Sequence, residues 1–83
     1  MVKNENILVG KALRELRAKV GMTQEKVAAQ LAVPQSFVSK VETGERSLKL
    51  SEAFQYAEAL GIQMSELVAT VQEQIAEGNG SAE

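Results

Sequence analysis

The stretch TQEKVAAQLAVPQSFVSKVETGE, residues 23–45, contains the only proline of the chain, with a short apolar pattern on each side of it. Proline inside a helix removes a hydrogen bond and clashes with the preceding turn, so one continuous helix is excluded. A linker would not need the two apolar patterns. The stretch therefore predicts two short helices that meet at a fixed angle.

Helix-end signals place these two helices within the stretch. Thr23 can accept a hydrogen bond from a first-turn amide, and Glu25 lies where the helix dipole favours a negative charge. Residues 32–33 are left as the connection. Pro34 suits the first turn of the second helix because no amide hydrogen is needed there, and Gly44 is a natural C-cap. The apolar face of the first helix consists of Val27, Ala28 and Leu31.

Apolar spacing predicts three more helices outside this stretch. The first runs from near Ile7 to Gly21, the second covers residues 50–60, and the third begins near Met64. Their inward positions are expected to be Val9, Leu13, Leu16 and Val20, then Leu50, Phe54, Ala57 and Leu60, then Leu67, Val68, Val71 and Ile75. No segment alternates like a strand, so the predicted fold class is all-α.

The length and composition favour one domain with a modest core, since 45% of the 83 residues are hydrophobic. We assign residues 1–6 to a flexible N-terminus and residues 7–77 to the helical domain with an extended C-terminal helix. The composition of GNGSAE, residues 78–83, is typical of a disordered tail.

The absence of Cys, His and Asp narrows the possible chemistry. It excludes disulfides and thiolate nucleophiles and removes the usual metal ligands and proton shuttles. We therefore expect that the protein has no catalytic residues, binds no metal or cofactor, and is not an enzyme. No apolar run approaches the roughly 20 residues that a membrane-spanning helix needs, and the N-terminus lacks the apolar core of a signal peptide. We therefore expect a cytoplasmic protein with no membrane partner.

The charges are divided unevenly along the chain. All nine basic residues lie in residues 1–50 with five Glu, a net charge of +4, whereas residues 51–83 carry six Glu and no base, a net charge of -6. Such asymmetry suggests a polyanion partner for one face. The alternative is ordinary scattered surface charge.

The helix predicted at residues 35–42 has a short polar face. A projection at about 100° per residue places Gln35, Ser36, Ser39 and Lys40 opposite Phe37, Val38 and Val41. Gln can pair bidentately with adenine, Lys with guanine acceptors, and Ser with base edges or phosphate, as a reader of the DNA major groove requires. A plain solvated helix face is the alternative, because most surface helices are amphipathic.

Residues 10–70 resemble the helix-turn-helix domain of the phage-repressor and Cro type, also called the xenobiotic-response-element (XRE) family. Three segments carry the resemblance: LRELRAKVGMTQEKVAAQLAV, QSFVSKVETGER and AEALGIQMSELV. The resemblance implies a compact five-helix bundle of the lambda-repressor-like DNA-binding type, with the helix-turn-helix at its second and third helices. In such bundles the third helix enters the major groove while the second lies across the DNA backbone.

The resemblance also implies roles for individual residues. The base-reading positions are Gln35, Ser36 and Lys40. Gln24, Thr43 and Arg46 match positions that contact the DNA backbone, Ser39 matches one that contacts phosphate or base, and Gln24 also buttresses Gln35. Lys49 is a further candidate for the DNA backbone, although any solvated loop could carry Arg46 and Lys49. Arg17 and Glu42 match a partly buried ion pair that joins the first and third helices. The chain departs from the family pattern at Ala32, where Gly is common because the turn needs a positive φ, and at Leu48, where Pro is common.

The function expected from these observations is that of a sequence-specific DNA-binding transcriptional regulator, which binds double-stranded DNA at a palindromic operator as a homodimer. The dimer surface is expected on the last helix, at Leu67, Val71 and Ile75, with core packing as the alternative. An antitoxin or coactivator-like module whose main partner is another protein remains a second hypothesis, suited by the acidic second half. A small autonomous repressor and a restriction-modification controller both fit.

Overall fold

Five helices follow one another in the computed structural model, which describes the backbone of residues 2–82 and the side chains of residues 5–77. They are α1 (Val2–Val20), α2 (Gln24–Leu31), α3 (Gln35–Thr43), α4 (Leu50–Leu60) and α5 (Met64–Ala82). Residues 2–82 contain no strand, which confirms the predicted all-α class and the five-helix arrangement. No helix in the described part of the chain is both long enough and apolar enough to cross a membrane.

The first and last helices extend further than the sequence patterns predicted. α1 begins at Val2 rather than near Ile7, and α5 continues to Ala82, so both of the segments expected to be flexible are largely helical. The side chains of residues 1–4 and 78–83 lie outside the described residues. The disorder expected for residues 1–6 and 78–83 therefore stays a prediction.

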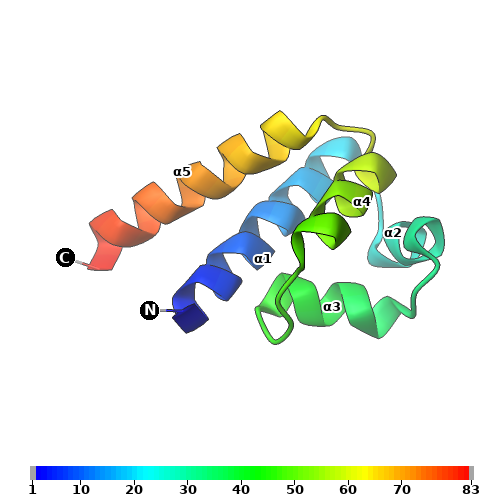
Figure 1. The fold of residues 1–83 in the computed structure, drawn as a ribbon, viewed down its shortest axis with the longest axis horizontal. Coiled ribbons are helices and arrows are strands. Elements are labelled where there is room, and N and C mark those ends of the chain that lie inside the picture. Colours follow the sequence, from blue (N-terminus) through cyan, green and yellow to red (C-terminus); the bar gives the residue numbers. More distant parts are fainter. Residues whose placement is uncertain (1, 83) are drawn as a thin grey trace.

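The helices form a bundle in which α3 occupies one edge. α1 and α5 lie side by side and run in opposite directions, while α3 lies along the lower edge in Figure 1. α3 packs against α1 and α2, and α4 contacts α1, α2 and α5. A buried Gln74 side chain ties α5 to α1, since its Nε2 donates to Glu15 Oε2 at 2.8 Å. One side of α3 is thus held by the bundle and the other is left free.

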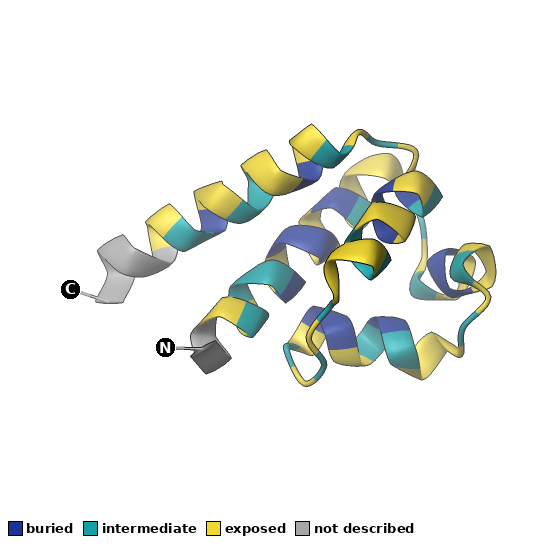
Figure 2. Ribbon diagram, viewed as in Figure 1, coloured by how far each residue is buried: buried dark blue, intermediate teal, exposed yellow. Residues whose placement is uncertain are grey.

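The core lies between the helices (Figure 2). It contains an aromatic residue that the apolar pattern missed. Tyr56 is fully buried in it, and its burial raises the pKa of the phenol. Its hydroxyl has no hydrogen-bond partner among the described residues. The other buried members of the core are Leu13, Leu16, Val27, Ala28, Val38, Val41, Ala57, Leu60 and Leu67.

Several residues predicted to face inward are instead exposed, and those predictions were wrong. The exposed fractions are 70% for Leu50, 54% for Phe54, 44% for Val68 and 39% for Val20. In α4 the reason is a different register: Ala53, Tyr56, Ala57 and Leu60, at i, i+3, i+4 and i+7, form the stripe that faces the core. This rotation turns Phe54 away from the core.

α1 and α3 touch through their backbones at Gly10. A Cβ atom added at Gly10 would lie 2.5 Å from the carbonyl oxygens of Val41 and of Glu42, which is closer than real Cβ contacts come. Because backbone atoms cannot move aside as a flexible side chain can, a larger residue would push the two helices apart. The absence of a side chain at position 10 therefore sets the separation of α1 and α3.

We expect Gly10→Ala to destabilise the fold by about 1–3 kcal/mol, the usual effect of overpacking. In an unobstructed helix the same change would be favourable by about 0.5–1 kcal/mol. Ala18→Gly, at an exposed position of α1, serves as the control and should lose about 1 kcal/mol. Urea unfolding of the three proteins measures both effects, and a gain in stability for Gly10→Ala would show that the crossing is not tight.

Candidate nucleic-acid interface

The turn between α2 and α3 is fixed by specific backbone geometry. The Lys26 amide donates to the Thr23 side chain at 3.1 Å, which caps α2. α2 ends at Ala32 with φ 59° and ψ 45°, and the amide of Val33 donates back to the Ala28 carbonyl at 3.0 Å. Alanine in this left-handed region costs roughly 1–2 kcal/mol, so the surrounding contacts hold it there. Pro34 is the N-cap residue of α3.

The two short helices are held at their angle by a shared apolar contact. Val27 and Ala28 of α2 and Val38 and Val41 of α3 are all buried in one core cluster. α3 ends at Gly44, whose φ of 85° suits glycine and whose amide donates to the Val41 carbonyl at 3.1 Å. The outer face of α3 is therefore presented in one orientation.

The three predicted base-reading residues share the exposed side of α3. Gln35, Ser36 and Lys40 are exposed, whereas Ser39 and Phe37 are half-buried. Thr43 is also exposed, but its hydroxyl lies 3.2 Å from the Lys40 carbonyl and 3.3 Å from Glu45 Oε2. The free side of α3 thus presents an amide, a hydroxyl and an ammonium group, a set able to address base edges.

An ion pair connects α3 to α1 beneath this face. Arg17 Nε donates to Glu42 Oε2 at 2.6 Å and its Nη2 to Oε1 at 3.1 Å, while Nη1 donates to the Met22 carbonyl at 2.9 Å. The Arg17 side chain is 17% exposed and that of Glu42 is 3% exposed. The hydrogen bond to Glu42 raises the pKa of Arg17 despite the opposing effect of burial. The Arg17 guanidinium therefore holds both oxygens of the Glu42 carboxyl group in a bidentate pair.

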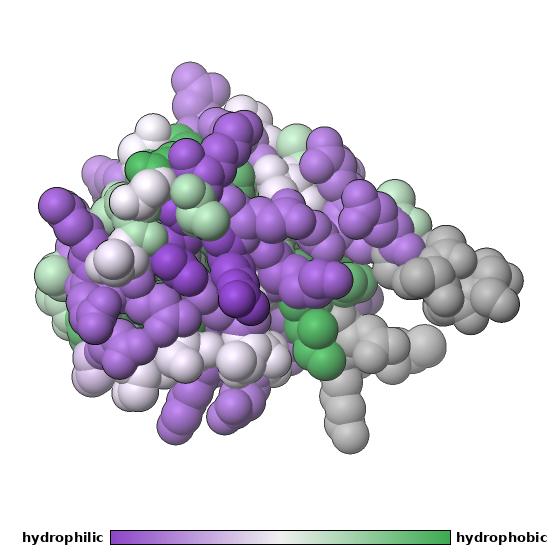
Figure 3. All heavy atoms as spheres, turned by 180° about the vertical axis from the view of Figure 1, so that it is seen from behind, coloured by the Kyte–Doolittle hydropathy of each residue, from purple (hydrophilic) through white to green (hydrophobic). Residues whose placement is uncertain are grey.

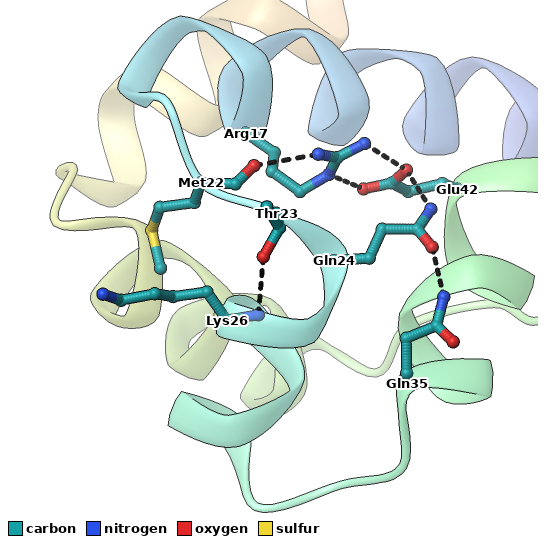
Figure 4. A network of polar contacts seen from close by, with 7 residues as sticks. All are labelled: Arg17, Met22, Thr23, Gln24, Lys26, Gln35 and Glu42. Carbon is teal, nitrogen blue, oxygen red and sulfur yellow. Dashed lines mark hydrogen bonds and ion pairs between the residues drawn. The ribbon is translucent and has the colours of Figure 1, made fainter.

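Gln24 and Gln35 extend the ion pair to the surface (Figure 4). Gln24 Nε2 donates to Glu42 Oε1 at 2.8 Å, and Gln35 Nε2 donates to Gln24 Oε1 at 2.6 Å. Four side chains from α1, α2 and α3 thus form one continuous network that begins in the interior and ends on the exposed face. The resemblance implied the contact between the two glutamines, but sequence reasoning missed the bond from Gln24 to Glu42, because only the tertiary fold brings them together.

Arg46 is engaged within the protein. Its guanidinium lies 4.4 Å from the centroid of the Phe37 ring and donates to the Ser47 carbonyl at 2.7 Å and to both Glu52 oxygens at 3.2 Å. The Lys49 amide and the Arg46 guanidinium lower the pKa of the Glu52 carboxyl. Lys49 itself is exposed. Of the two basic residues in this loop, Lys49 is the one with the freer charge.

We expect Arg17→Ala and Glu42→Ala each to destabilise the fold, with a loss approaching about 3 kcal/mol for Arg17→Ala, which leaves the nearly buried Glu42 without its counter-ion. The double variant should lose less than the sum by about 0.5–3 kcal/mol, because the partner of the removed group is gone too. Denaturant unfolding of the four proteins completes the cycle. Strict additivity would show that the two side chains do not interact.

Comparison with known proteins agrees with this geometry. The profile of the helix-turn-helix family matches residues 13–67, so the chain belongs to that family, which confirms the resemblance inferred from the sequence. The chain is similar to the control protein C.BamHI of Bacillus amyloliquefaciens, with 32% identity over 69 residues that cover 82% of this chain and 85% of that protein. It is also similar to the uncharacterized HTH-type transcriptional regulator y4dJ of Sinorhizobium fredii, 36% identical over 66 residues, covering 80% and 86%.

A solved structure supports the same assignment. The restriction-modification controller protein C.AhdI from Aeromonas hydrophila superposes with a TM-score of 0.72 and is 36% identical, covering 77% of this chain and 97% of that one. In helix-turn-helix proteins the second helix of the motif is the one that lies in the major groove. In this chain that helix is α3, whose exposed side carries the polar residues described above.

Proposed function

We propose that the protein is a sequence-specific DNA-binding transcriptional regulator that occupies a palindromic operator as a homodimer. The observation that carries this proposal is the exposed face of α3, where Gln35, Ser36 and Lys40 lie together on a helix held by two others. Gln35 suits adenine, Lys40 suits the acceptors of guanine, and Ser36 suits either base edges or phosphate.

The remaining predicted contacts surround this face and suit phosphates. Lys49 is exposed, and the half-buried Gln24 and Ser39 lie beside the reading residues. Phosphate contacts fix the register of the protein on the duplex without reading sequence. Because Arg46 already pairs with Glu52, its contribution to phosphate binding is expected to be smaller than that of Lys49. The net charge of -2 implies weak nonspecific affinity, so base reading must supply much of the selectivity.

We expect Gln35→Ala and Lys40→Ala each to relax the base preference at particular operator positions by about 1–3 kcal/mol. Lys49→Ala should instead weaken binding to all sequences about equally and reduce the slope of log affinity against log salt by about one unit. Selection of bound DNA from a random pool, followed by titrations at several salt concentrations, separates the two effects. Equal affinity for specific and random DNA would favour the alternative, an interaction module whose main partner is a protein.

A homodimer follows from the size of the site, because one such domain contacts about half of an operator. The surface expected for dimerisation needs revision: Leu67 is buried in the core of the single chain, so it cannot serve a partner. We propose a dimer surface formed by Leu50 and Val68, which are exposed and border an apolar hollow between α4 and α5, together with the exposed Phe54 of α4. The face shown in Figure 3 is mostly hydrophilic, with its apolar side chains in small separate groups.

We expect Phe54→Glu to shift the protein from dimer to monomer, because the partner copy would have to bury a carboxylate without a counter-ion. The helical fold should persist, since Phe54 lies outside the core. Sedimentation and circular dichroism measure the two properties, and operator affinity should fall with the loss of the dimer. Ala69→Glu, at an exposed position of α5, is the control and should leave the dimer intact. A dimeric Phe54→Glu protein would place the interface elsewhere.

The relatives favour one regulatory setting over the other two. C.BamHI is a control protein and C.AhdI is a restriction-modification controller, which supports a controller role for this chain over an autonomous repressor or an antitoxin. On this proposal, the selected DNA site should occur upstream of restriction and modification genes. A selected site found only beside unrelated genes would oppose it.

A further inference from the structure

We propose that Glu42 fixes the orientation of the Gln35 amide, that is, where its oxygen and its nitrogen point. This orientation sets the base preference at the operator position that Gln35 reads. The effect is transmitted through the amide of Gln24. The inference rests on the proposed DNA-reading role of α3. It makes Glu42 a positioning residue for specificity, in addition to its part in the ion pair with Arg17.

The Glu42 carboxylate fixes the orientation of the Gln24 amide. An ionised carboxylate accepts hydrogen bonds and cannot donate them. Its Oε2 is engaged by Arg17 Nε at 2.6 Å, while Oε1 lies 3.1 Å from Arg17 Nη2 and 2.8 Å from Gln24 Nε2. Gln24 must therefore present its NH₂ group to Glu42. The reversed amide would bring the Gln24 carbonyl oxygen against a carboxylate oxygen in a nearly buried place, where it would have no donor.

The orientation of the Gln24 amide determines that of Gln35. With its nitrogen committed to Glu42, Gln24 presents its Oε1 to α3, and Gln35 Nε2 donates to that oxygen at 2.6 Å. Gln35 is thus oriented by the same argument, because an amide oxygen needs a donor opposite it. One N–H of Gln35 is used, and the other N–H remains beside its Oε1. This adjacent donor and acceptor match N7 and N6 of adenine.

Arg17 and Glu42, from which this relay of hydrogen bonds starts, are held rigidly. Arg17 is fixed at a second point by the Met22 carbonyl, 2.9 Å from its Nη1, and the Glu42 side chain is only 3% exposed. Figure 4 shows the sequence of contacts from Arg17 and Glu42 through Gln24 to Gln35. The Glu42 carboxylate cannot change its partners while the ion pair persists. Only the Gln35 amide, at the other end of the relay, meets solvent or DNA.

The variant that tests the relay is Glu42→Gln, which keeps the shape of the side chain and adds an NH₂ group. If the amide oxygen stays with Arg17 Nε, the new NH₂ group replaces Oε1 and faces both Gln24 and Arg17 Nη2, which must then turn away from it. Gln24 then turns over to accept, its own NH₂ group faces α3, and the Gln35 amide turns over in response. We expect the preference for adenine at the Gln35 position to fall about tenfold, with the preference at the Lys40 position unchanged.

Gln24→Met provides a second variant that does not depend on the stability of Glu42→Gln. Methionine fills a similar volume at a half-buried position and cannot transmit amide orientation. We expect it to reduce the preference at the Gln35 position by a similar factor. Competition binding against operators with each base substituted at each position gives the readout, with circular dichroism as the check on folding. A merely structural role would weaken binding to all operators equally.

The comparison with Gln35→Ala separates the two proposals. If Gln35→Ala relaxes one operator position while folded Glu42→Gln and Gln24→Met keep the adenine preference there, the relay is wrong and the reading role stands. If Glu42→Gln fails to fold, the result for Gln24→Met decides. If Gln35→Ala changes no position, the reading role fails and the relay fails with it.

Discussion

The bidentate pair between Arg17 and Glu42 is the interaction on which the position of α3 depends. Two charges removed from water need further hydrogen bonds to offset their desolvation. Here the Met22 carbonyl and the Gln24 amide supply them, so the donors and acceptors at the centre of the network are matched. A fully satisfied polar network of this kind favours one arrangement of the helices over close alternatives. The exposed side of α3, which we propose as the DNA-reading face, inherits that single arrangement.

Local chemistry made the helix-turn-helix predictable, whereas the registry of α4 depended on tertiary packing. Thr23, Pro34 and Gly44 act on the backbone within a few residues. Thr23 caps α2 and Gly44 ends α3 as predicted, whereas Pro34 precedes α3 as its N-cap residue and does not lie in its first turn. In α4 the apolar spacing placed Phe54 on the inward face with Leu50, Ala57 and Leu60. The bundle instead buries Tyr56 and leaves Phe54 exposed. Sequence pattern alone could not rank two aromatic rings two positions apart.

The candidate site also has features that the sequence predicts and features that depend on the tertiary fold. A helical projection sufficed to put Gln35, Ser36 and Lys40 on the exposed side, because each position depends only on helix geometry. The pairing of Arg46 with Glu52 and the bond from Gln24 to Glu42 join separate elements, and no local pattern encodes them. The contact of α1 with α3 at Gly10 was missed for another reason, since a glycine in a helical pattern is usually read as a weak helix former.

The backbone contact at Gly10 also has a consequence for the architecture of the DNA target. In a two-fold dimer the two reading helices must fit half-sites whose centres are roughly 34–36 Å apart. The distance of each α3 from its own α1 is one component of that separation, and the missing side chain at position 10 holds it at its minimum. Any residue larger than glycine there would displace both reading helices by symmetry. On the proposed function, a glycine packed against the backbone of α3 thus helps to define the spacing of the operators that the protein can recognise.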